Sequence, residues 1–483
     1  MVFLAEKTKV LDGLGKWTRE VFAMIAGACM APHPPLIIPE IGRGEERNIQ
    51  DTVCAYHEAA RRIAEWKPET IVLISPHQMM YADYFHISPG DGAKGDFRQF
   101  SSVQVKMEAV YDTEFVENLC KLAKAGNLPA GTAGERDRRL DHGTMVPLYF
   151  VNQYWTDYRL VRVGLSGLPL SAHYELGRRM KETAKILGRR TVVIASGDLS
   201  HRLAAQGPYG YKEEGPEYDR RVMDVMGNGD FGKLLEFSED FCEKAGECGH
   251  RSFVMMAGVL DRTGVAAERL CYEGPFGVGY GICTYEVCGK DLTRNFKEQY
   301  EEKERERIQG LRAKEDAYVR LARETIETYV RTGVKGEIPE NLPEEMYTQR
   351  AGVFVSIKKE GQLRGCIGTI QAVQPSIAEE IAENAVSASV KDPRFSPIEP
   401  EELEKLVISV DVLGDTEKID SEDMLDVRRY GVVVTEGYRR GLLLPNLEGI
   451  DTVKEQVRIA RQKAGIGEQE EVQLERFEVI RHY

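Results

Sequence analysis

The 483-residue chain lacks several features that would quickly assign it to a class of protein. It contains no apolar stretch long enough to span a bilayer, so we expect no membrane insertion. Lys and Arg number 64 against 78 Asp and Glu, a net charge of -14, which argues against the basic surface of a nucleic-acid-binding protein. None of the nine cysteines forms a CxxC pair and no cleavable signal peptide is visible, so we expect reduced thiols in a cytoplasmic protein.

Histidine is also scarce, with nine in the chain, and two of the nine end similar segments. Residues 70–77 read TIVLISPH, and residues 191–201 read TVVIASGDLSH. Each segment begins with a β-branched run without polar alternation, which is typical of a strand buried on both faces of an α/β sheet. His77 and His201 then lie just past the carboxyl ends of these strands, where open α/β sheets bind ligands. The pattern predicts a metal site or an acid–base site; two unrelated loop histidines are the alternative.

Strand-like and helix-like segments alternate between about residues 25 and 288, which predicts an α/β domain with a largely parallel or mixed sheet. We expect strands at 25–30, 71–75, 85–88, 160–165 and 193–196, and helices at 45–66, 113–126, 172–187, 216–227, 231–245 and 250–262. Residue 24 looks like a natural beginning of the fold. Residues 1–23 are therefore expected to be an extension, with an amphipathic terminal helix as the alternative.

The composition changes after residue 288. Residues 295–312 carry opposite charges at helical spacing, which predicts a solvated connecting helix. Residues 318–330 then place apolar side chains on one face of a helix. Further strands are expected at 352–357, 406–412, 431–434 and 441–444, and further helices at 376–390 and 452–463. The predicted organisation is an α/β domain at 24–288 with helices on both faces of its sheet, a charged helical linker at 289–312 and an α+β domain at 313–481.

Further histidines of the first domain also lie beside prolines, glycines and acidic residues. His33 follows the first predicted strand in APHPP, and His142 lies in LDHGTMVPL. Glu247 and Cys248 precede a glycine and His250, ahead of an apolar helix. The prolines and glycines beside these residues fix irregular backbone, which a rigid set of metal ligands needs.

This ordered series resembles the class III extradiol ring-cleaving dioxygenases of LigB type and their relatives in the MEMO family, over roughly residues 24–288. The resemblance implies that His33 and His77 bind a metal ion. It also implies that His201 lies over the substrate and that His142 is a second histidine of the pocket. The implied activity is an oxidoreductase with a non-heme metal, Fe(II) first and zinc or copper as alternatives, acting on a small catechol-like or phenolic substrate.

The identity of the third metal ligand does not follow from the resemblance alone. LigB-type enzymes have a glutamate there and MEMO relatives a cysteine followed by glycine, and this chain offers both as Glu247 and Cys248. Two histidines and a carboxylate suit Fe(II), whereas a thiolate favours softer metals or redox sensitivity. The Cys-Gly register, which matches that of MEMO proteins, favours Cys248 as the third ligand. Dioxygenase chemistry favours Glu247, and we expect Glu247 to be the ligand. The nitrogens of His33 and His77 should lie roughly 3–4 Å apart, because metal–nitrogen bonds are about 2 Å long.

The second domain contains LRGCIG at 363–368, DPRF at 392–395 and LVISVDVL at 406–413. These segments closely resemble the AMMECR domain, over about residues 313–481. If 363–368 is extended, Arg364 and Cys366 share one face, and the guanidinium would favour the Cys366 thiolate as a reactive or ligand-binding group. The alternative is structural: the glycines allow close packing, Arg364 pairs with a carboxylate and Cys366 is buried.

A LigB-like part fused ahead of an AMMECR part resembles the protein A type of the AmmeMemoRadiSam system. The resemblance implies a radical-SAM partner, which must be a separate protein because this chain contains no CxxxCxxC iron–sulfur motif. Two functions are therefore carried forward. One is a metal-dependent enzyme of extradiol type, which the pocket histidines His142 and His201 favour. The other is a MEMO-like metal-binding scaffold whose AMMECR domain recruits a partner.

Overall fold

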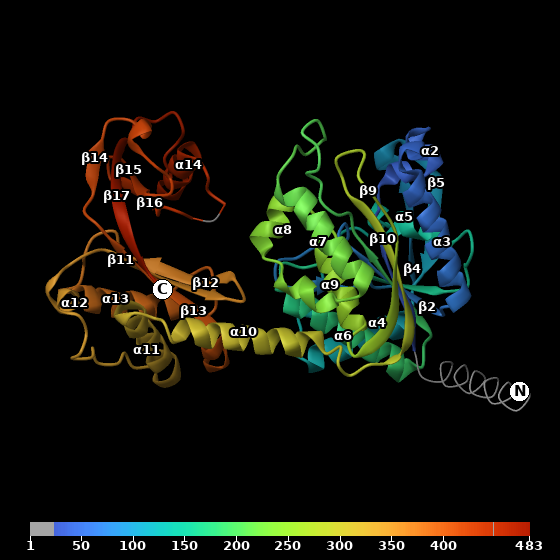
Figure 1. Cartoon of the computed structure of the whole chain (residues 1–483), viewed down its shortest axis with the longest axis horizontal. Helices are drawn as coiled ribbons and strands as arrows, with labels where there is room; N and C mark the ends of the chain where they lie inside the picture. The colour runs from blue at the N-terminus through green and yellow to red at the C-terminus, as the bar shows by residue number, and fades with distance from the viewer. Residues whose placement is uncertain (1–23, 448) are drawn as a thin grey trace, which may run out of the picture. The chain divides into compact units, whose positions relative to one another are not determined.

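The computed structural model describes residues 24–447 and 449–483 (Figure 1), so the predicted extension or terminal helix at residues 1–23 lies outside the described residues. The chain divides into two compact units, Met1–Tyr300 and Glu301–Tyr483. The first is an α/β unit with a mixed sheet, and the second has an antiparallel sheet with helices, which confirms both predicted fold classes. Every helix in the described ranges is too short or too polar to cross a membrane.

The first unit is built around a six-stranded sheet in the order β7-β2-β8-β1-β10-β9. The strands are β1 (Ile25–Ala31), β2 (Thr70–Ser75), β7 (Arg159–Gly164), β8 (Thr191–Ser196), β9 (Thr263–Glu273) and β10 (Tyr280–Lys290). The first four in sheet order are parallel, whereas β10 and β9 add an antiparallel edge. Every residue of β1, β2 and β8 is buried, as their continuous apolar sequences predict.

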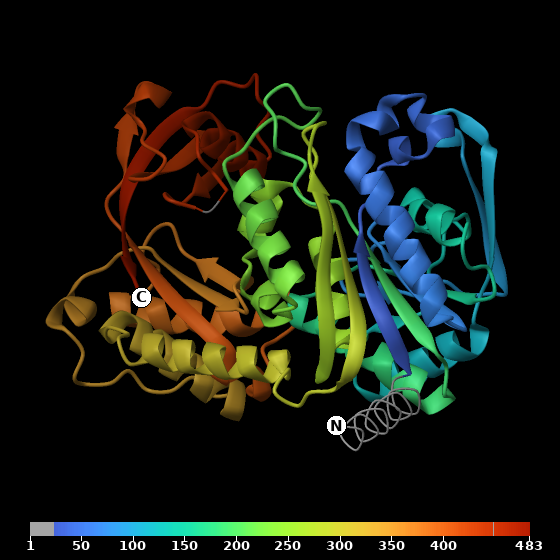
Figure 2. The same cartoon turned by 45° about the vertical axis from the view of Figure 1, so that its right-hand side comes forward.

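Helices cover both faces of this sheet (Figures 1 and 2). They are α3 (Gln50–Trp66), α4 (Thr113–Ala125), α5 (His142–Val151), α6 (Leu170–Leu187), α7 (Glu214–Asn228), α8 (Glu239–Ala245) and α9 (His250–Val259). Alternate residues of β2 enter different cores, because successive side chains of a strand point to opposite faces. Val72 and Ile74 pack in the core that contains α6 and α9, and Ile71 and Leu73 pack in the core of α3 and α5.

Smaller elements complete the first unit. They are α2 (Pro39–Gly42), β3 (Phe85–His86), β4 (Gly92–Phe97), β5 (Ser102–Val110) and β6 (Ala130–Gly131), with the 3-10 turns η1 (Pro35–Ile37), η2 (Glu45–Ile49), η3 (Arg98–Phe100) and η4 (Phe231–Glu236). The helix predicted at 231–245 is in fact divided into η4 and α8. The division occurs because the side chain of Ser238 caps α8 by accepting a hydrogen bond from the backbone N–H of Phe241.

The second unit contains an antiparallel sheet in the order β12-β11-β13-β17-β15-β16, with β14 paired to β17. Its strands are β11 (Val353–Lys359), β12 (Gln362–Gly368), β13 (Leu406–Leu413), β14 (Glu417–Ile419), β15 (Tyr430–Glu436), β16 (Arg439–Leu443) and β17 (Gln473–His482). Its helices are α11 (Ala317–Thr332), α12 (Glu344–Thr348), α13 (Ile377–Val390) and α14 (Val453–Ala464), with the turns η5 (Pro400–Lys405) and η6 (Glu422–Met424). The helices α11 and α13 share a core with β11 and β13, and α14 shares one with β15 and β16.

The charged segment at 295–312 forms helix α10 (Phe296–Arg312), which passes from one unit to the next in sequence. Phe296 is buried against Phe231 of the first unit, and Ile308 is buried in the second. Most other side chains of α10 are exposed, as expected for a helix whose charges alternate at helical spacing.

Candidate metal centre

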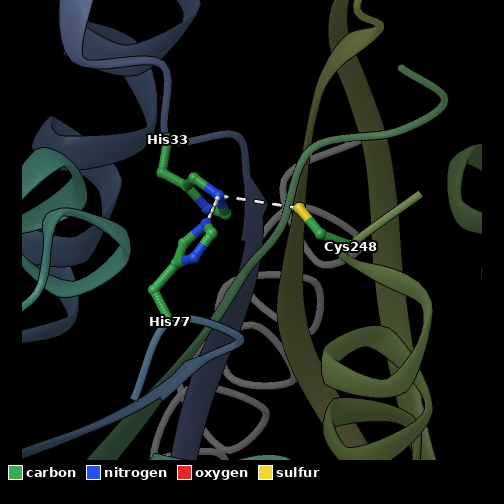
Figure 3. Close-up of side chains that lie close together, drawn as sticks. All are labelled: His33, His77 and Cys248. Atoms are coloured by element: carbon green, nitrogen blue, oxygen red, sulfur yellow. Dashed lines mark hydrogen bonds between the residues drawn. The ribbon is translucent and has the colours of Figure 1, made fainter. Parts of the chain in front are cut away.

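Three neighbouring parallel strands bring their following loops to one edge of the first sheet. His33 follows β1, His77 follows β2, and Asp198 and His201 follow β8, which lies between the other two strands. Because the strands are parallel, their carboxyl ends meet at this edge. Cys248 joins the group from the turn before α9 (Figure 3).

The side chains of His33, His77 and Cys248 point toward one another (Figure 3). The Nε2 atom of His33 lies 2.9 Å from Nε2 of His77 and 3.6 Å from Sγ of Cys248. All three donor atoms lie within 4.8 Å of one another. The two nitrogens are thus slightly closer than the roughly 3–4 Å expected of two imidazoles on one ion.

Ser196 determines which ring nitrogen of His33 carries the proton. Its hydroxyl donates to the carbonyl oxygen of Gly143 at 2.6 Å, so its oxygen accepts a hydrogen bond from Nδ1 of His33 at 2.9 Å. A proton on Nδ1 leaves the lone pair of Nε2 directed at His77 and Cys248. Two imidazole nitrogens this close need a proton or a cation between them, and a cation satisfies the sulfur as well. The donor set therefore fits a metal ion.

Burial keeps the imidazoles of His33, His77 and the adjacent His142 in the neutral form. Burial lowers the pKa of His33 well below its usual value, and the neighbouring His77 acts in the same direction. Burial also lowers the pKa of His77, although the Asp141 carboxylate opposes the shift. The pKa of His142 falls to about 3, through burial and the proximity of His77 and His33. Neutral nitrogens are available to a cation across the physiological pH range.

The Cys248 thiol is buried among acidic neighbours. Burial raises its pKa well above the usual value, and Asp198 and Glu247 act in the same direction. The backbone N–H of Asp198 donates to the sulfur at 3.3 Å and partly opposes this rise. Because cysteine binds metals as the thiolate, metal binding at this site releases a proton.

Asp198 is a further potential donor that the sequence reasoning did not single out. Its Oδ1 accepts from the backbone N–H of His33 at 2.7 Å, and its Oδ2 lies 4.0 Å from Nε2 of the same residue. With His201 and Cys248 it forms a second group of donor atoms within 4.8 Å of one another. The signal that could have found it is its position two residues after the last residue of β8, at the same edge of the sheet.

Glu247, the expected third ligand, faces elsewhere. Its Oε2 accepts a hydrogen bond from the backbone N–H of His250 at 2.5 Å, at the start of α9. Burial raises its pKa to about 7. It lines a separate cavity of about 410 Å³ together with Cys242 and His250. The Glu247 carboxylate is thus engaged in a hydrogen bond at the N-terminus of α9, and the sulfur of Cys248, not this carboxylate, lies beside the two histidines.

Two more imidazoles surround the cluster. The ring of His142 lies 4.0 Å from that of His77 and 5.4 Å from that of His33. His201 packs beside Tyr209, with ring centroids 5.1 Å apart, and its buried Nε2 has no hydrogen-bond partner in the described part of the chain. Burial lowers the pKa of His201, while the nearby Asp198 opposes the shift. Both rings are therefore in the neutral form, because burial lowers the pKa of each.

A cavity of about 230 Å³ adjoins the cluster at His77 and His142. Its apolar wall is formed by Met79, Phe100, Leu140 and Met145, and its polar wall includes Gln78, Arg98, Arg139 and Arg162 with the carboxylates of Asp96, Asp137 and Asp141. This mixture of apolar surface and a few directed polar groups is typical of small-molecule sites.

In the second unit, the structure separates Arg364 from the thiol of Cys366. The Arg364 guanidinium pairs with Glu402 at 2.9 Å and donates to two backbone carbonyls. The Cys366 sulfur instead accepts a hydrogen bond from the hydroxyl of Ser356 at 3.2 Å. The cause is a β-bulge: Leu363 pairs with Lys358 and residue 365 with residue 357, so Arg364 is an extra residue that breaks the period of two.

The glycines of this strand are needed for packing. A Cβ on Gly365 would lie 2.2 Å from the carbonyl oxygen of Ala388 in α13, and one on Gly368 would lie 2.2 Å from the ring of Phe354. Close packing and an Arg–carboxylate pair, two parts of the structural alternative, are therefore present. Cys366 itself is only partly buried.

Two protein families match the two units of the chain. Residues 27–283 match the family described as "Catalytic LigB subunit of aromatic ring-opening dioxygenase", and residues 319–482 match the AMMECR1 family. The chain belongs to the LigB family and carries a following AMMECR1 domain. This combination confirms the resemblance on which the site residues were proposed.

Relatives of this LigB-family protein share one or both parts. A protein of Clostridium acetobutylicum is 40% identical over 470 residues, covering 94% of this chain and 98% of that protein. A protein of Thermotoga maritima is 49% identical over 170 residues, covering 35% of this chain and 98% of that protein. The crystal structure of an uncharacterized protein from Pyrococcus horikoshii is 33% identical, covers 34% of this chain and 88% of its own, and gives a TM-score of 0.32.

Proposed function

We propose that the first unit is a metal-dependent enzyme that cleaves the ring of a small catechol or related phenol. The observation that carries the proposal is that His33, His77 and Cys248 converge beside two neutral imidazoles, His142 and His201. The buried Nε2 of His201 has no hydrogen-bond partner among the described residues. A site that only binds a metal needs its ligands alone. A neutral imidazole next to the ligands, here that of His201, suits the removal of a phenolic proton.

The donors available define which ions suit the site. His33, His77 and Cys248 would hold the ion, with the Asp198 carboxylate close enough to supply an oxygen. Two histidines with a carboxylate suit Fe(II), which we propose first, and a thiolate also suits zinc or copper. When bound, Fe(II) would supply Lewis-acid and redox chemistry to a catechol and O₂.

His201 is the group we assign to the first proton transfer. Its Nε2 is buried and unpaired within the described residues, so a phenolic hydroxyl placed there provides the missing donor. The imidazolium formed would lie close to the carboxylate of Asp198, which favours the charged ring. His142, whose ring meets Phe100 edge-on at 5.2 Å, is placed to orient the aromatic ring of the substrate.

The test uses the full chain purified without oxygen. Metal analysis should find close to one ion per chain, and a panel of catechols should give ring-opened products, seen as new visible or near-ultraviolet absorbance, only when O₂ is added. Oxygen uptake should match product formation. Bound metal with no oxygen uptake on any catechol would contradict the proposal.

The thiol of Cys248 favours a second candidate function. The resemblance to MEMO proteins associates a cysteine at this position with metal binding, and a thiolate gives a site suited to softer metals. In that case the first unit binds metal without ring cleavage, and the AMMECR1 domain recruits a partner. A separate radical-SAM protein is the partner we propose for either function. Stable metal binding, no turnover and co-purification with such a protein would favour the scaffold.

A further inference from the structure

Three small polar side chains form a row on one face of the second sheet. Ser356 of β11 pairs with Cys366 of β12 on one side and with Ser409 of β13 on the other. Opposed residues of neighbouring antiparallel strands share a face of the sheet. All three residues are partly buried, whereas the neighbours of Ser356 and Ser409 along their strands are buried in the core with α11 and α13. The row is therefore a polar strip on the opposite face of the sheet.

The thiol of Cys366 is held in position without being sealed in the core. A Cβ on Gly365 would meet the carbonyl oxygen of Ala388 in α13, so residue 365 faces this helix and the next side chain faces away from it. The Cys366 sulfur accepts a hydrogen bond from the Ser356 hydroxyl at 3.2 Å. The backbone N–H of Cys366 donates to Oδ2 of Asp392 at 2.9 Å.

Arg394, in the loop after α13, is the first of two cations near this thiol. Its Nη2 donates to the backbone carbonyl of Cys366 at 3.1 Å. Its Nε and Nη2 donate to the two carboxylate oxygens of Asp392 at 2.9 and 2.7 Å, and these bonds are the main reason why the pKa of Arg394 is raised. The charge of Cys366 adds to this rise. Among the described residues, Nη1 of Arg394 has no hydrogen-bond partner, so it keeps donors for another acceptor.

Lys463 of α14 is the second cation. Partial shielding from water lowers its pKa and Arg394 acts in the same direction, whereas Cys366 raises it. The three groups therefore lie close together, although α14 packs in the core of β15 and β16 rather than in that of β11 and β13. Asp392 offsets the charge of Arg394, but the ammonium group of Lys463 has no hydrogen bond or ion pair in the described part of the chain. The unpaired charge at this thiol is thus positive.

We propose that the second unit binds an oxyanion, the carboxylate or phosphate group of a small molecule, between Arg394 and Lys463 and next to the thiol of Cys366. Nη1 of Arg394 and Nζ of Lys463 donate hydrogen bonds to the oxyanion. The site uses side chains of the second unit alone and does not depend on the proposed function of the first. Arg364, which is engaged by Glu402 and backbone carbonyls, takes no part.

The test compares two alkylating reagents that differ only in the acidic group. Iodoacetate is an anion and iodoacetamide is neutral; with either reagent a sulfur–carbon bond forms, iodide leaves and the thiol proton passes to the solvent. Peptide mass spectrometry of the folded, full-length protein at neutral pH would measure the rate at each cysteine, with the exposed Cys54 and Cys288 as references. We expect the iodoacetate-to-iodoacetamide rate ratio at Cys366 to exceed that of the references by about tenfold at low ionic strength, and to fall as salt is added.

Variants of the two cations test their roles. Arg394→Gln and Lys463→Gln should each lower the ratio at Cys366, and the double variant should bring it to the value of the references. Arg394 also supports β12, so the decisive variant is Lys463→Gln, which removes no hydrogen bond among the described residues. The matched control is Lys454→Gln. Lys454 is an exposed lysine in the first turn of the same helix, so this variant should leave the ratio unchanged.

Competition with unreactive anions distinguishes the two kinds of oxyanion. Inorganic phosphate and acetate, added separately at equal ionic strength, should slow the reaction of Cys366 with iodoacetamide and leave the references unchanged. The anion that acts at the lower concentration identifies the group that the site prefers. A ratio at Cys366 equal to that of the references, no reaction of Cys366 with either reagent, an unchanged ratio in Lys463→Gln, or protection by neither anion would overturn the proposal.

Discussion

The histidine loops of the first unit and strand β12 of the second both gather cysteine, glycine and charged residues, but they differ in what those side chains have left to bind. In the first unit, Nε2 of His33 faces His77 and Cys248, and Nε2 of His201 has no partner among the described residues. In the second, Arg364 is fully engaged by Glu402 and backbone carbonyls. Donor and acceptor atoms that lack a partner, more than the types of residue present, distinguish a ligand-binding site from a cluster that only stabilises the fold.

The same contrast holds for one local Asp–Arg arrangement that occurs in both units. Asp392 and Arg394 of the second unit repeat the contacts of Asp96 with Arg98. Arg394, however, uses its Nη2 group to donate also to the carbonyl of Cys366 at 3.1 Å, which covers the edge of β12. Identical sequence spacing therefore supports the strand in one unit and places an arginine in the wall of a cavity in the other.

The largest effect should come from removing a ligand of the metal centre. His77→Ala removes one of the two converging nitrogens, so metal content should fall to near zero and turnover with it. The loss should exceed the 10–100-fold typical of changes next to the ligands. Metal analysis after anaerobic purification measures this directly. His57→Ala, a histidine paired with Tyr154 outside the cluster, is the control and should keep its metal.

Replacing His201 should separate chemistry from metal binding. We expect His201→Ala to keep its metal but to lose about 10²–10⁴-fold in turnover, the usual contribution of a general base. Steady-state rates normalised to bound metal provide the measurement. If metal content fell as far as in His77→Ala, His201 would instead be a ligand, consistent with its position near Asp198 and Cys248.

A smaller effect should distinguish the two adjacent candidates for the third ligand. Cys248→Ser replaces a thiolate ligand with a hydroxyl and should weaken metal binding by more than the roughly 10–100-fold typical of changes beside the ligands, whereas Glu247→Gln should leave affinity close to normal. Competition with a chelator of known affinity would measure both. A stronger loss in Glu247→Gln would reverse the assignment, and we would then place the carboxylate in the site.

The smallest effect concerns the second unit. Burial alone would raise the pKa of Glu402, but hydrogen bonds from Arg364 and Lys359 hold it at about 2. The stabilisation is therefore complete above the usual value of 4.5 and is lost as the pH falls toward 2. Glu402→Gln should destabilise β12 by about 1.5–3 kcal/mol at neutral pH, with the difference from the unmodified protein shrinking in acid.

Hydrogen exchange of β12 peptides, corrected for intrinsic rates, would measure that change at neutral and acidic pH. Glu404→Gln is the matched control because Glu404 lies in the same turn and is exposed. An equal loss of protection at both pH values would show that the Glu402 charge does not stabilise this strand.

Much of the first sheet could be predicted because its parallel strands are buried on both faces and are continuously apolar. The edge strands β9 and β10 were not predicted. Glycines and charged residues interrupt their pattern, most of β9 is only partly buried, and the last five residues of β10 are exposed or partly exposed. Both strands are needed to complete the sheet, yet neither carries a residue of the metal centre.

The site was predicted in part for the same reason. A histidine just past a buried strand has a position that the sheet determines, so His33 and His77 could be brought together from sequence. The sequence could not predict which side chain of the turn before α9 points at the histidines, because neighbouring side chains of a turn point in different directions. In the structure, the backbone path directs Cys248 toward His33 and Glu247 toward the start of α9. At Arg364 a β-bulge altered the alternation on which the prediction rested.

The central claim is that Cys248 completes a metal centre with His33 and His77, and X-ray absorption at the metal edge tests it most directly. The spectrum of anaerobically purified protein should require one sulfur neighbour at about 2.3 Å together with imidazole nitrogens at about 2.0–2.1 Å if the ion is zinc, with similar distances for iron. The sulfur contribution should vanish in Cys248→Ser. A spectrum fitted by nitrogen and oxygen alone, or one unchanged in that variant, would contradict the account.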